Sequence, residues 1–552
     1  MARDPDRRVP FHEWPAPVPK PRRADDVPRV RVERVGGEWQ VLDALGRVVV
    51  LHGLNVGQGS KNPPWRSIGM GDEDAFRLMR SWGVNAIRLV LPWEALEPEP
   101  RRFDMETLAY VRWFLDQARS NDMLVVLDNH HNEVSRCFGG TGAPRWAHRP
   151  GVIPDEAAAR DCRYVGYPGL DSLPHQLRWW ADFWDGAWTP DDLALQDHVV
   201  WAWQKLAEVV RGHPALLGYG PFNEPHCYTG LAGRLLYPGE TRCEEALSAF
   251  YRRFAFAIRA VDPDSLLFVE PPLAMIAPDW DGADTGIELP PVPGVVLSVH
   301  WYDGAVLDAG CDSTWDRDRC DLAEFLASTG RLAADRFGTA RVLTEHGVHG
   351  CKRGAAEDLA HQMVDVEDAG ASSFVWNLFV VGDTWGMTAP RTGGEDMSLV
   401  VPEIYASDPS QAGRPRCHAG AFVRPVPRRI AGEPIAWGFD RSFDAWDGAP
   451  DRHHDGRAVA GTDTFTLSFR QTAVVGDTHV FVPRALVFGE DPATEAPEFT
   501  VDVSDGTWRW APDDPNVLVW TANPAVPEHT LTIKTWGGRR APGNGIGDCV
   551  PP

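Results

Sequence analysis

Between about residues 49 and 379, apolar strand-like runs alternate with amphipathic helix-like stretches, and this alternation constrains the fold more than any other feature of the chain. Eight such runs can be counted, each nearly continuous in apolar residues. Parallel strands that are covered on both faces have this character. The runs are Val49–Val56, Ala86–Leu91, Met123–His130, Leu216–Glu224, Leu266–Pro272, Val295–Tyr302, Arg341–Gly347 and Ser372–Phe379.

Helical periodicity separates these runs, for example over Asp74–Trp82, Glu106–Ser120, Leu195–Arg211, Glu244–Ala260, Leu322–Phe337 and Ala355–Ala369. Eight strand and helix units predict a (β/α)8 TIM barrel. A doubly wound open sheet also alternates strands and helices, but it needs fewer strands and normally has a Gly-rich nucleotide turn after the first one. The first run is followed by no such turn, so we favour the barrel.

The pattern of apolar and polar residues changes after about Arg424. Helical periodicity gives way to short alternating runs at residues 464–469, 478–482, 499–503, 517–521 and 529–535, which predict an antiparallel β-sandwich. We therefore expect an N-terminal extension over residues 1–27, a TIM barrel over 28–424 and a C-terminal β-sandwich over 425–552. The Pro-rich segment 423–429 is the expected linker, and residues 29–50 are expected to form a hairpin that closes the barrel floor.

Active sites of TIM barrels lie at the C-terminal ends of the strands, so polar residues that end apolar strands are candidates by position. A single buried His or Glu is usually only a satisfied core group. Nine polar or aromatic residues that converge on one barrel mouth indicate a functional site instead. They are Lys61, Arg88, His130, Asn223, Glu224, His300, Tyr302, Glu345 and Trp376.

Two of these residues are carboxylates at strand ends, Glu224 in Phe-Asn-Glu-Pro and Glu345 in Leu-Thr-Glu-His-Gly. Two facing carboxylates are what a retaining glycoside hydrolase requires, because one protonates the leaving oxygen while the other attacks the sugar. Glu345 would have to stay ionised, so we expect Arg88 and the Tyr302 hydroxyl beside it, holding its pKa down. Glu224 would have to hold a proton at rest, which the negative charge of Glu345 favours.

The constellation resembles glycoside hydrolase family 5 over about residues 52–379. Arg88, His130, Asn223–Glu224, His300, Tyr302, Glu345 and Trp376 stand where that family has its Arg, His, Asn-Glu pair, His-x-Tyr, Glu and Trp. The resemblance implies that Glu224 is the acid/base, that Glu345 is the nucleophile and that Asn223 binds the sugar 2-hydroxyl. It also implies that no cofactor and no metal takes part.

Within the family, the chain is similar to the endoglycoceramidase and glycosylceramidase branch. The similar segments are 53–61, 128–135, 139–147 and 478–483. This similarity implies that Lys61 and His131 also bind substrate, although a solvated loop lysine is an equally good interpretation of Lys61.

The connection from Glu133 to Leu193 is very long for a β/α loop and contains six aromatic residues of interest. Connections of this length in compact domains are usually functional. An aromatic wall above the barrel mouth would suit an apolar aglycone, and the alternative is that the rings form a small core of the loop itself. The six are Trp146, Trp179, Trp180, Phe183, Trp184 and Trp188. The loops at 228–239 and 382–398 are expected to complete the subsites.

These observations predict a retaining β-glycosidase that acts on β-glucosides or oligosaccharides linked to a lipid-like aglycone such as ceramide or a sterol. An endo-β-glucanase or mannanase on the same scaffold is the first alternative. A non-catalytic carbohydrate-binding barrel is the second, and the intact pair Glu224 and Glu345 disfavours it. The sandwich could bind carbohydrate or membrane, or only brace the barrel.

Net charge and cysteine content bear on the expected binding partners and cellular location of the protein. A net charge of −24, spread along the chain, argues against a nucleic-acid or anionic-membrane footprint. No apolar run is long enough to span a bilayer, and no signal-peptide pattern follows the charged first residues. Nine Cys lack zinc-type spacing, which we interpret as reduced thiols in a cytoplasm. Cys311 and Cys320 are close enough in sequence to bridge across a loop.

Overall fold

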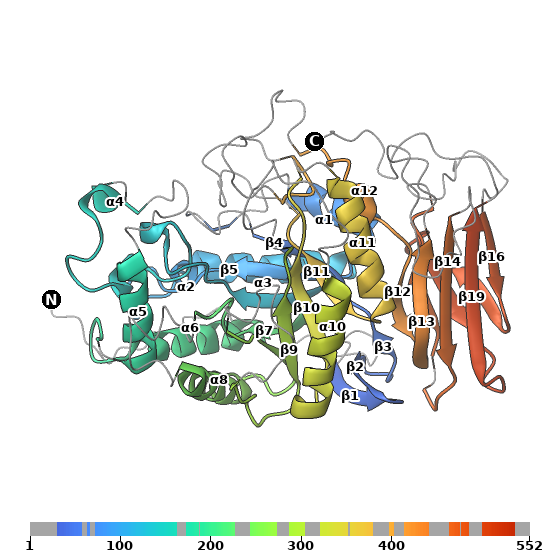
Figure 1. The fold of residues 1–552 in the computed structure, drawn as a ribbon, viewed down its shortest axis with the longest axis horizontal. Helices are drawn as coiled ribbons and strands as arrows, with labels where there is room; N and C mark the ends of the chain where they lie inside the picture. The colour runs from blue at the N-terminus through green and yellow to red at the C-terminus, as the bar shows by residue number, and fades with distance from the viewer. Residues whose placement is uncertain are drawn as a thin grey trace.

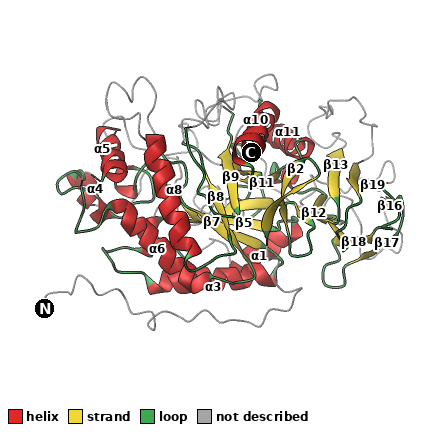
Figure 2. Ribbon diagram, turned by 90° about the horizontal axis from the view of Figure 1, so that it is seen from below, coloured by secondary structure: helices red, strands yellow, loops and turns green. Residues whose placement is uncertain are grey.

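The computed structural model describes residues 30–57, 63, 65–66, 72–159, 161–162, 173–186, 188–226, 243–272, 286–303, 321–350, 354–378, 397–401, 413–440, 463–474, 476–484 and 499–535. Its centre is a closed barrel of eight parallel strands, β4 to β11 (Figures 1 and 2). The strands are β4 His52–Val56, β5 Ala86–Leu91, β6 Leu124–Asn129, β7 Leu216–Gly220, β8 Leu266–Val269, β9 Val295–His300, β10 Arg341–His346 and β11 Ser372–Val375. The predicted TIM barrel is therefore confirmed, strand by strand.

Helices cover the outside of the barrel, and their bounds are close to the predicted ones. They are α1 Asp72–Ser81, α3 Met105–Ser120, α6 Leu195–Val210, α8 Cys243–Arg259, α10 Leu322–Arg331, which continues as a π-helical segment over Leu332–Phe337, and α11 Ala355–Asp368. The start of α3 illustrates why they form. Asp104 accepts hydrogen bonds from the backbone N–H groups of Glu106 and Thr107, the usual N-cap arrangement.

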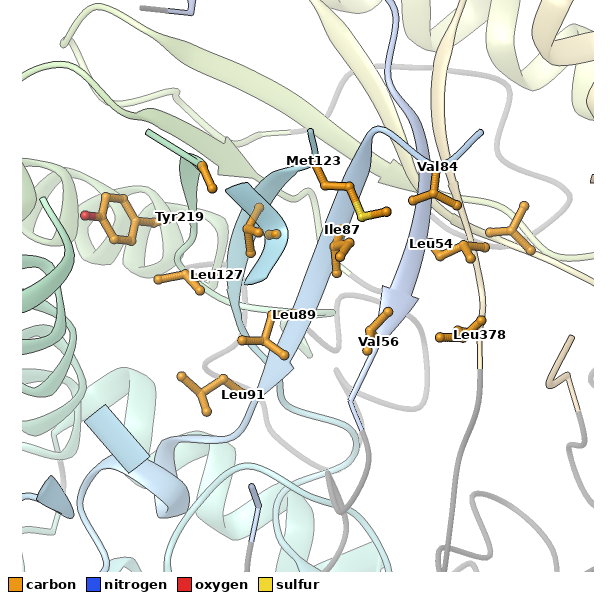
Figure 3. Close-up of a cluster of buried hydrophobic side chains, with 14 of the residues drawn as sticks. Leu54, Val56, Val84, Ile87, Leu89, Leu91, Met123, Leu127, Tyr219 and Leu378 are labelled. Atoms are coloured by element: carbon orange, nitrogen blue, oxygen red, sulfur yellow. The ribbon is translucent and has the colours of Figure 1, made fainter. Parts of the chain in front are cut away.

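Strand residues alternate between the two faces of the barrel wall. Ile87 and Leu89 of β5 point outward, where they pack with Leu54 and Leu127 of the neighbouring strands (Figure 3). The residue between them, Arg88, therefore points into the barrel. The same alternation turns Asn55 of β4 inward between Leu54 and Val56.

The N-terminal hairpin closes the barrel floor as predicted. It consists of β1 Arg31–Val35, β2 Glu38–Leu42 and the short strand β3 Val48–Val49. Val30, Val41 and Val49 share one buried cluster with barrel residues such as Val126 and Phe268. The hairpin also has a second role, because β3 pairs with strand β12 of the C-terminal region.

The C-terminal region consists of two antiparallel sheets. One runs β1-β2-β3-β12-β15-β18-β17 and the other β13-β14-β19-β16. Phe469 of β14 and Trp520 of β18 meet between them, with ring centroids 5.2 Å apart, as expected of a sandwich. The strands are β12 Val426–Ile430, β13 Glu433–Asp440, β14 Thr464–Arg470, β15 Thr478–Phe481, β16 Phe499–Val503, β17 Thr507–Trp510, β18 Val517–Thr521 and β19 Glu528–Thr535.

The Pro-rich segment 423–429 is not the linker that we predicted. Val426–Ile430 is a strand between β3 and β15, and its Pro427 lies at a bulge in the pairing with β15, where a missing N–H is tolerated. Short helix α12 Ala419–Phe422 precedes it. Arg424 joins the two regions through a buried ion pair to Glu367 of α11, with Nε and Oε1 2.6 Å apart. The predicted boundary at 424/425 thus falls inside a packed joint, and residues 1–27 lie outside the described part of the chain.

A disulfide joins Cys137 and Cys162 within the insert after β6. Cys417 is also disulfide-bonded. The interpretation of the cysteines as reduced thiols is therefore wrong, and the cytoplasmic location loses the support it drew from them. Cys311 and Cys320 lie outside the described residues. None of the described helices has both the length and the apolar character needed to cross a bilayer.

Candidate active site

The barrel brings together seven of the predicted site residues at the C-terminal ends of its strands. Arg88 lies within β5, His300 ends β9 and Glu345 lies near the end of β10. The loops that follow the strands supply the others, which are His130 after β6, Asn223 and Glu224 after β7 and Tyr302 after β9. An eighth, Trp376 after β11, belongs to a small buried cluster against which Tyr302 packs.

Arg88 is the centre of the polar network. Its side chain is 1% exposed and reaches three carboxylates and two amides. Nη1 donates to Oε1 of Glu345 at 2.6 Å, and Nη2 donates to Oδ1 of Asn223 at 2.6 Å and to Oε1 of Glu270 at 3.0 Å. Nη2 also lies 2.8 Å from Oδ1 of Asp128. These contacts let Arg88 orient the polar groups around it.

The two predicted carboxylates face each other. One oxygen of Glu224, one oxygen of Glu345 and one nitrogen of His300 all lie within 4.8 Å of one another. Tyr302 donates its hydroxyl to Oε2 of Glu345 at 2.8 Å, and Nδ1 of His300 lies 2.9 Å from Oε1 of Glu224. Glu224 is the more accessible of the pair, with 14% of its side chain exposed against 5% for Glu345.

The electrostatics of Glu345 differ from our expectation. Arg88 and Tyr302 lie beside it as predicted, but burial raises the pKa of Glu345 above its usual value, and the neighbouring carboxylates Glu224 and Glu270 add to the rise. His300 and Arg88 oppose it. The predicted lowering was wrong because the sequence does not reveal that a fully buried site holds several like charges.

The carboxylates around His300 favour the charged form of its ring. Burial disfavours the charged ring, but the carboxylates of Glu270 and Glu345 outweigh burial and raise the pKa of His300 well above its usual value. Nδ1 lies 2.9 Å from Oε1 of Glu224 and 3.6 Å from Oε2 of Glu345, whereas Nε2 lies 3.3 Å from Oε1 of Glu270.

Glu224 has an unusual backbone conformation. Its φ is +45°, in the left-handed region that non-glycine residues rarely adopt. Such a conformation costs about 1–2 kcal/mol and persists only where the surroundings enforce it. Here the backbone N–H of Glu224 donates to Oε2 of Glu270 at 2.8 Å.

His130 and Trp376 lie together beside the network. Their rings stack with centroids 5.3 Å apart, and Nδ1 of His130 lies 2.7 Å from Oδ2 of Asp128. Asp128 thus connects His130 to Arg88.

His131, which we predicted to bind substrate, has a buried ring that packs among aromatic residues. Its ring stacks on Phe222 at 4.2 Å, and burial lowers its pKa to about 3. Its backbone carbonyl accepts a hydrogen bond from Nδ2 of Asn223 at 2.7 Å, so the residue positions Asn223 through the main chain. Lys61 lies outside the described residues.

Sequence reasoning missed three polar residues of the network, Asn55, Asp128 and Glu270. Glu270 directly follows β8 and is 3% exposed. The rule that identified Glu224, a carboxylate at the end of an apolar strand, would have found it. Asn55 and Asp128 lie within strands, so their inward direction depends on strand register, which the sequence does not establish.

Three of the six predicted wall residues, Trp179, Trp180 and Phe183, are buried and so cannot line an open aromatic wall. The insert contains short helices η2 Arg136–Phe138 and η3 Arg145–Ala147, followed by α4 Asp155–Ala159 and α5 Leu173–Asp185. On α5, Trp179, Trp180 and Phe183 are at most 3% exposed. They pack with Trp184, Phe222 and Phe250. These six residues, which we call the aromatic cluster, are the small core that we considered as the alternative.

The loops at 228–239 and, apart from Met397 and Ser398, at 382–398 lie outside the described residues. Short helix α2 Trp93–Leu96 supports the insert, because Trp93 packs edge-to-face on Trp146.

Glu224, His300 and Glu345 are close enough to share a metal ion. Their contacts do not favour one, because the nitrogens of His300 already approach Glu224 and Glu270 and Arg88 already binds Glu345. Metal ligands need a neutral imidazole nitrogen and free carboxylate oxygens. The group is better described as an ion-pair network.

Comparison with known proteins agrees with this geometry. The sequence model of the family described as Cellulase (glycosyl hydrolase family 5) matches residues 42–380. Endoglycoceramidase I of Rhodococcus hoagii is 30% identical over 234 residues, which cover 42% of this chain and 44% of that protein. A glucosylceramidase of Rhizopus delemar is 29% identical over 248 residues, covering 35% and 36%. The chain thus matches less than half the length of these curated relatives.

Solved structures show the same fold. Endo-glycoceramidase II from Rhodococcus sp., in its ganglioside GM3 complex, superimposes with a TM-score of 0.67 at 20% identity, covering 90% of this chain and 99% of that one. Sterylglucosidase 1 of Cryptococcus neoformans has a TM-score of 0.66 at 16% identity, covering 94% and 98%. The family match spans more than half of the chain and includes every residue of the network from Arg88 to Trp376. The chain belongs to glycosyl hydrolase family 5.

Proposed function

We propose that this protein is a retaining β-glycosidase that hydrolyses β-glucosides or short oligosaccharides linked to a lipid-like aglycone. The observation that carries the proposal is the separation of at most 4.8 Å between carboxylate oxygens of Glu224 and Glu345. Retaining pairs are about 5–5.5 Å apart, whereas inverting pairs are about 6.5–9.5 Å apart to admit a water molecule.

In the first step, Glu345 attacks the anomeric carbon and forms an ester bond to the sugar. The bond between that carbon and the glycosidic oxygen breaks, and the oxygen leaves with the electron pair and a proton from Glu224. Tyr302 and Arg88 direct hydrogen bonds at Glu345 and so aim its oxygens at the sugar.

In the second step, Glu224 acts as a base. It removes a proton from water as the water oxygen attacks the anomeric carbon, and the ester bond to Glu345 breaks. Loss of the charge on Glu345 in the covalent intermediate weakens the hold of Glu224 on its proton, so one residue serves both steps.

Sugar binding is assigned to the residues around the pair. Oδ1 of Asn223 accepts from Arg88 and one N–H of Nδ2 donates to His131, so the second N–H of that amide is available for the sugar 2-hydroxyl. The stacked rings of His130 and Trp376 are proposed to contact the sugar from the β6 and β11 sides. Lys61 stays a predicted substrate-binding residue.

Support for a lipid-like aglycone comes from the related proteins and not from the insert after β6. Matched curated proteins are named as an endoglycoceramidase and a glucosylceramidase, and a structural neighbour is a complex with ganglioside GM3. The buried aromatic cluster supplies no apolar wall, so this part of the proposal draws nothing from it.

A hydrolysis screen tests the proposal. Purified protein is incubated with glucosylceramide, lactosylceramide, a steryl glucoside, cellotetraose and aryl β-glucosides, with Glu345→Gln protein as the control. We expect cleavage of at least one lipid-linked substrate, with release of the β-anomer as the first product by proton NMR.

The outcomes separate the parts of the proposal. Cleavage of cellotetraose alone would favour the endo-β-glucanase alternative, and a first product of α configuration would exclude retention. No turnover of any substrate by the folded protein would favour the non-catalytic alternative.

A further inference from the structure

Glu270 has no role in the two steps above, yet it contacts Arg88, His300 and the main chain of Glu224. Its carboxylate is 3% exposed, behind the facing pair. Oε2 accepts the backbone N–H of Glu224 at 2.8 Å, and Oε1 accepts from Arg88 at 3.0 Å and lies 3.3 Å from Nε2 of His300. We propose that Glu270 is a positioning residue, which keeps a proton on Nε2 of His300 and holds the main chain of Glu224, so that Nδ1 of His300 and Glu224 share the proton that the leaving oxygen receives.

Glu270 selects the tautomer of His300. Oε1 of Glu270 lies 3.3 Å from Nε2 of His300 and can only accept, so it favours a proton on that nitrogen. The other nitrogen, Nδ1, then meets Oε1 of Glu224 at 2.9 Å with a single proton between them. In the proposed arrangement, His300 and Glu224 hold that proton between them. A buried carboxylate that fixes a histidine tautomer plays the same part in serine hydrolases.

The state of Glu270 agrees with this role. Burial opposes its ionisation, but His300 outweighs burial with help from Arg88 and the N–H of Glu224, and the pKa of Glu270 is lowered. Other ionisable groups near Glu270 or His300 are Asp128, Tyr251 and Glu345, and Tyr302 binds the last of these. Tyr251 donates its hydroxyl to the backbone carbonyl of Glu270 and so anchors it to α8.

An amide cannot replace this carboxylate without conflict. If the oxygen of a glutamine faced the N–H of Glu224, its NH2 group would face the donors of Arg88 and His300. With the opposite orientation, the NH2 group would face the N–H of Glu224. Glu270→Gln therefore changes the charge and sets donor against donor, while it alters the volume very little.

The inference rests on the proposed function, and the test distinguishes the two. Glu270→Gln, Glu270→Asp and wild-type protein are assayed on aryl β-glucosides of increasing leaving-group pKa over the full pH range. Asp262→Asn is the matched control, since Asp262 is a buried carboxylate at the opposite end of β8 and accepts from Tyr219 at 2.8 Å.

For Glu270→Gln we expect kcat to fall about 10²-fold for poor leaving groups and much less for dinitrophenyl glucoside, which needs no protonation. Removing one negative charge should move both limbs of the pH profile of kcat/KM to lower pH by about one unit. Glu270→Asp keeps the charge, so its limbs should stay in place while kcat on poor leaving groups still falls.

Equal loss on all leaving groups with unmoved limbs would show a merely structural role and overturn the inference. If Glu270→Gln does not fold, Glu270→Asp decides, because wild-type kcat on poor leaving groups in that variant overturns it as well. A wild-type protein that hydrolyses no glycoside contradicts the proposed function instead. Asp262→Asn should leave both the leaving-group dependence and the pH limbs unchanged.

Discussion

Tyr302 donates its hydroxyl to Oε2 of Glu345 at 2.8 Å, on the opposite oxygen from the one that Arg88 holds. Glu345 is therefore fixed from two directions by donors that arise from different strands. The position of its carboxylate depends on the barrel as a whole.

Tyr302→Phe should lower kcat/KM for aryl β-glucosides by about 10- to 100-fold, because it removes one hydrogen bond to a charged group. KM should change little, and the fold should be retained. Tyr219→Phe serves as a control, since Tyr219 donates to Asp262 at 2.8 Å at the other end of the barrel. Equal losses in the two variants would contradict a specific role for Tyr302.

The two carboxylates should respond differently to removal. Glu345→Gln should abolish turnover of all substrates, whereas Glu224→Ala should slow poor leaving groups by about 10²–10⁴-fold and spare activated ones. Added azide should rescue Glu224→Ala with formation of the β-glycosyl azide. Rescue of a Glu345 variant to a product of retained configuration would reverse the two assignments.

Phe183→Ala should destabilise the protein by about 3–5 kcal/mol, because Phe183 is 1% exposed in the aromatic cluster. The activity that remains per folded molecule should fall to the same extent on lipid-linked and aryl glucosides. Denaturant unfolding and kinetics on both substrates check this. A selective loss on lipid-linked glucosides would restore the aromatic wall that we first expected.

His131→Phe should flatten the dependence of stability on pH. The folded-state pKa of His131 is lowered to about 3, while the unfolded value is near 6.5, so its contribution is present above about pH 6.5 and is lost as the pH falls towards 3. At pH 5 the linkage is about 2 kcal/mol. Unfolding free energies at pH 5 and pH 8 measure it, and an unchanged difference between them would contradict the buried, neutral ring.

Replacing Cys137 and Cys162 by Ser should lower the free energy of unfolding by about 3 kcal/mol, since the bridge closes a loop with a sequence separation of 25. A reductant should lower the Tm of the wild-type protein more than that of the double variant. If the reductant lowers the Tm of the two proteins equally, the bridge is not formed in solution.

Much of this protein could be predicted from the sequence, because buried parallel strands must be apolar throughout. That requirement located all eight barrel strands, and the rule for their C-terminal ends selected Glu224 and Glu345. Both rules apply to a single strand and need no knowledge of its neighbours. Five strands of the sandwich also followed from period-two alternation.

Tertiary structure decided whatever depends on two segments meeting. Val426–Ile430 forms a strand because β3 and β15 lie on either side of it. In the sequence, Pro427 makes this segment unlike a strand. His131 and the aromatic cluster are buried because α5 packs on Phe222, and no local pattern shows which face of a helix finds a partner. Likewise, Glu345 gains a raised rather than a lowered pKa because burial and other carboxylates act on it together. Local propensity acts along the chain, whereas burial and charge act through space, so they emerge only once the barrel has closed.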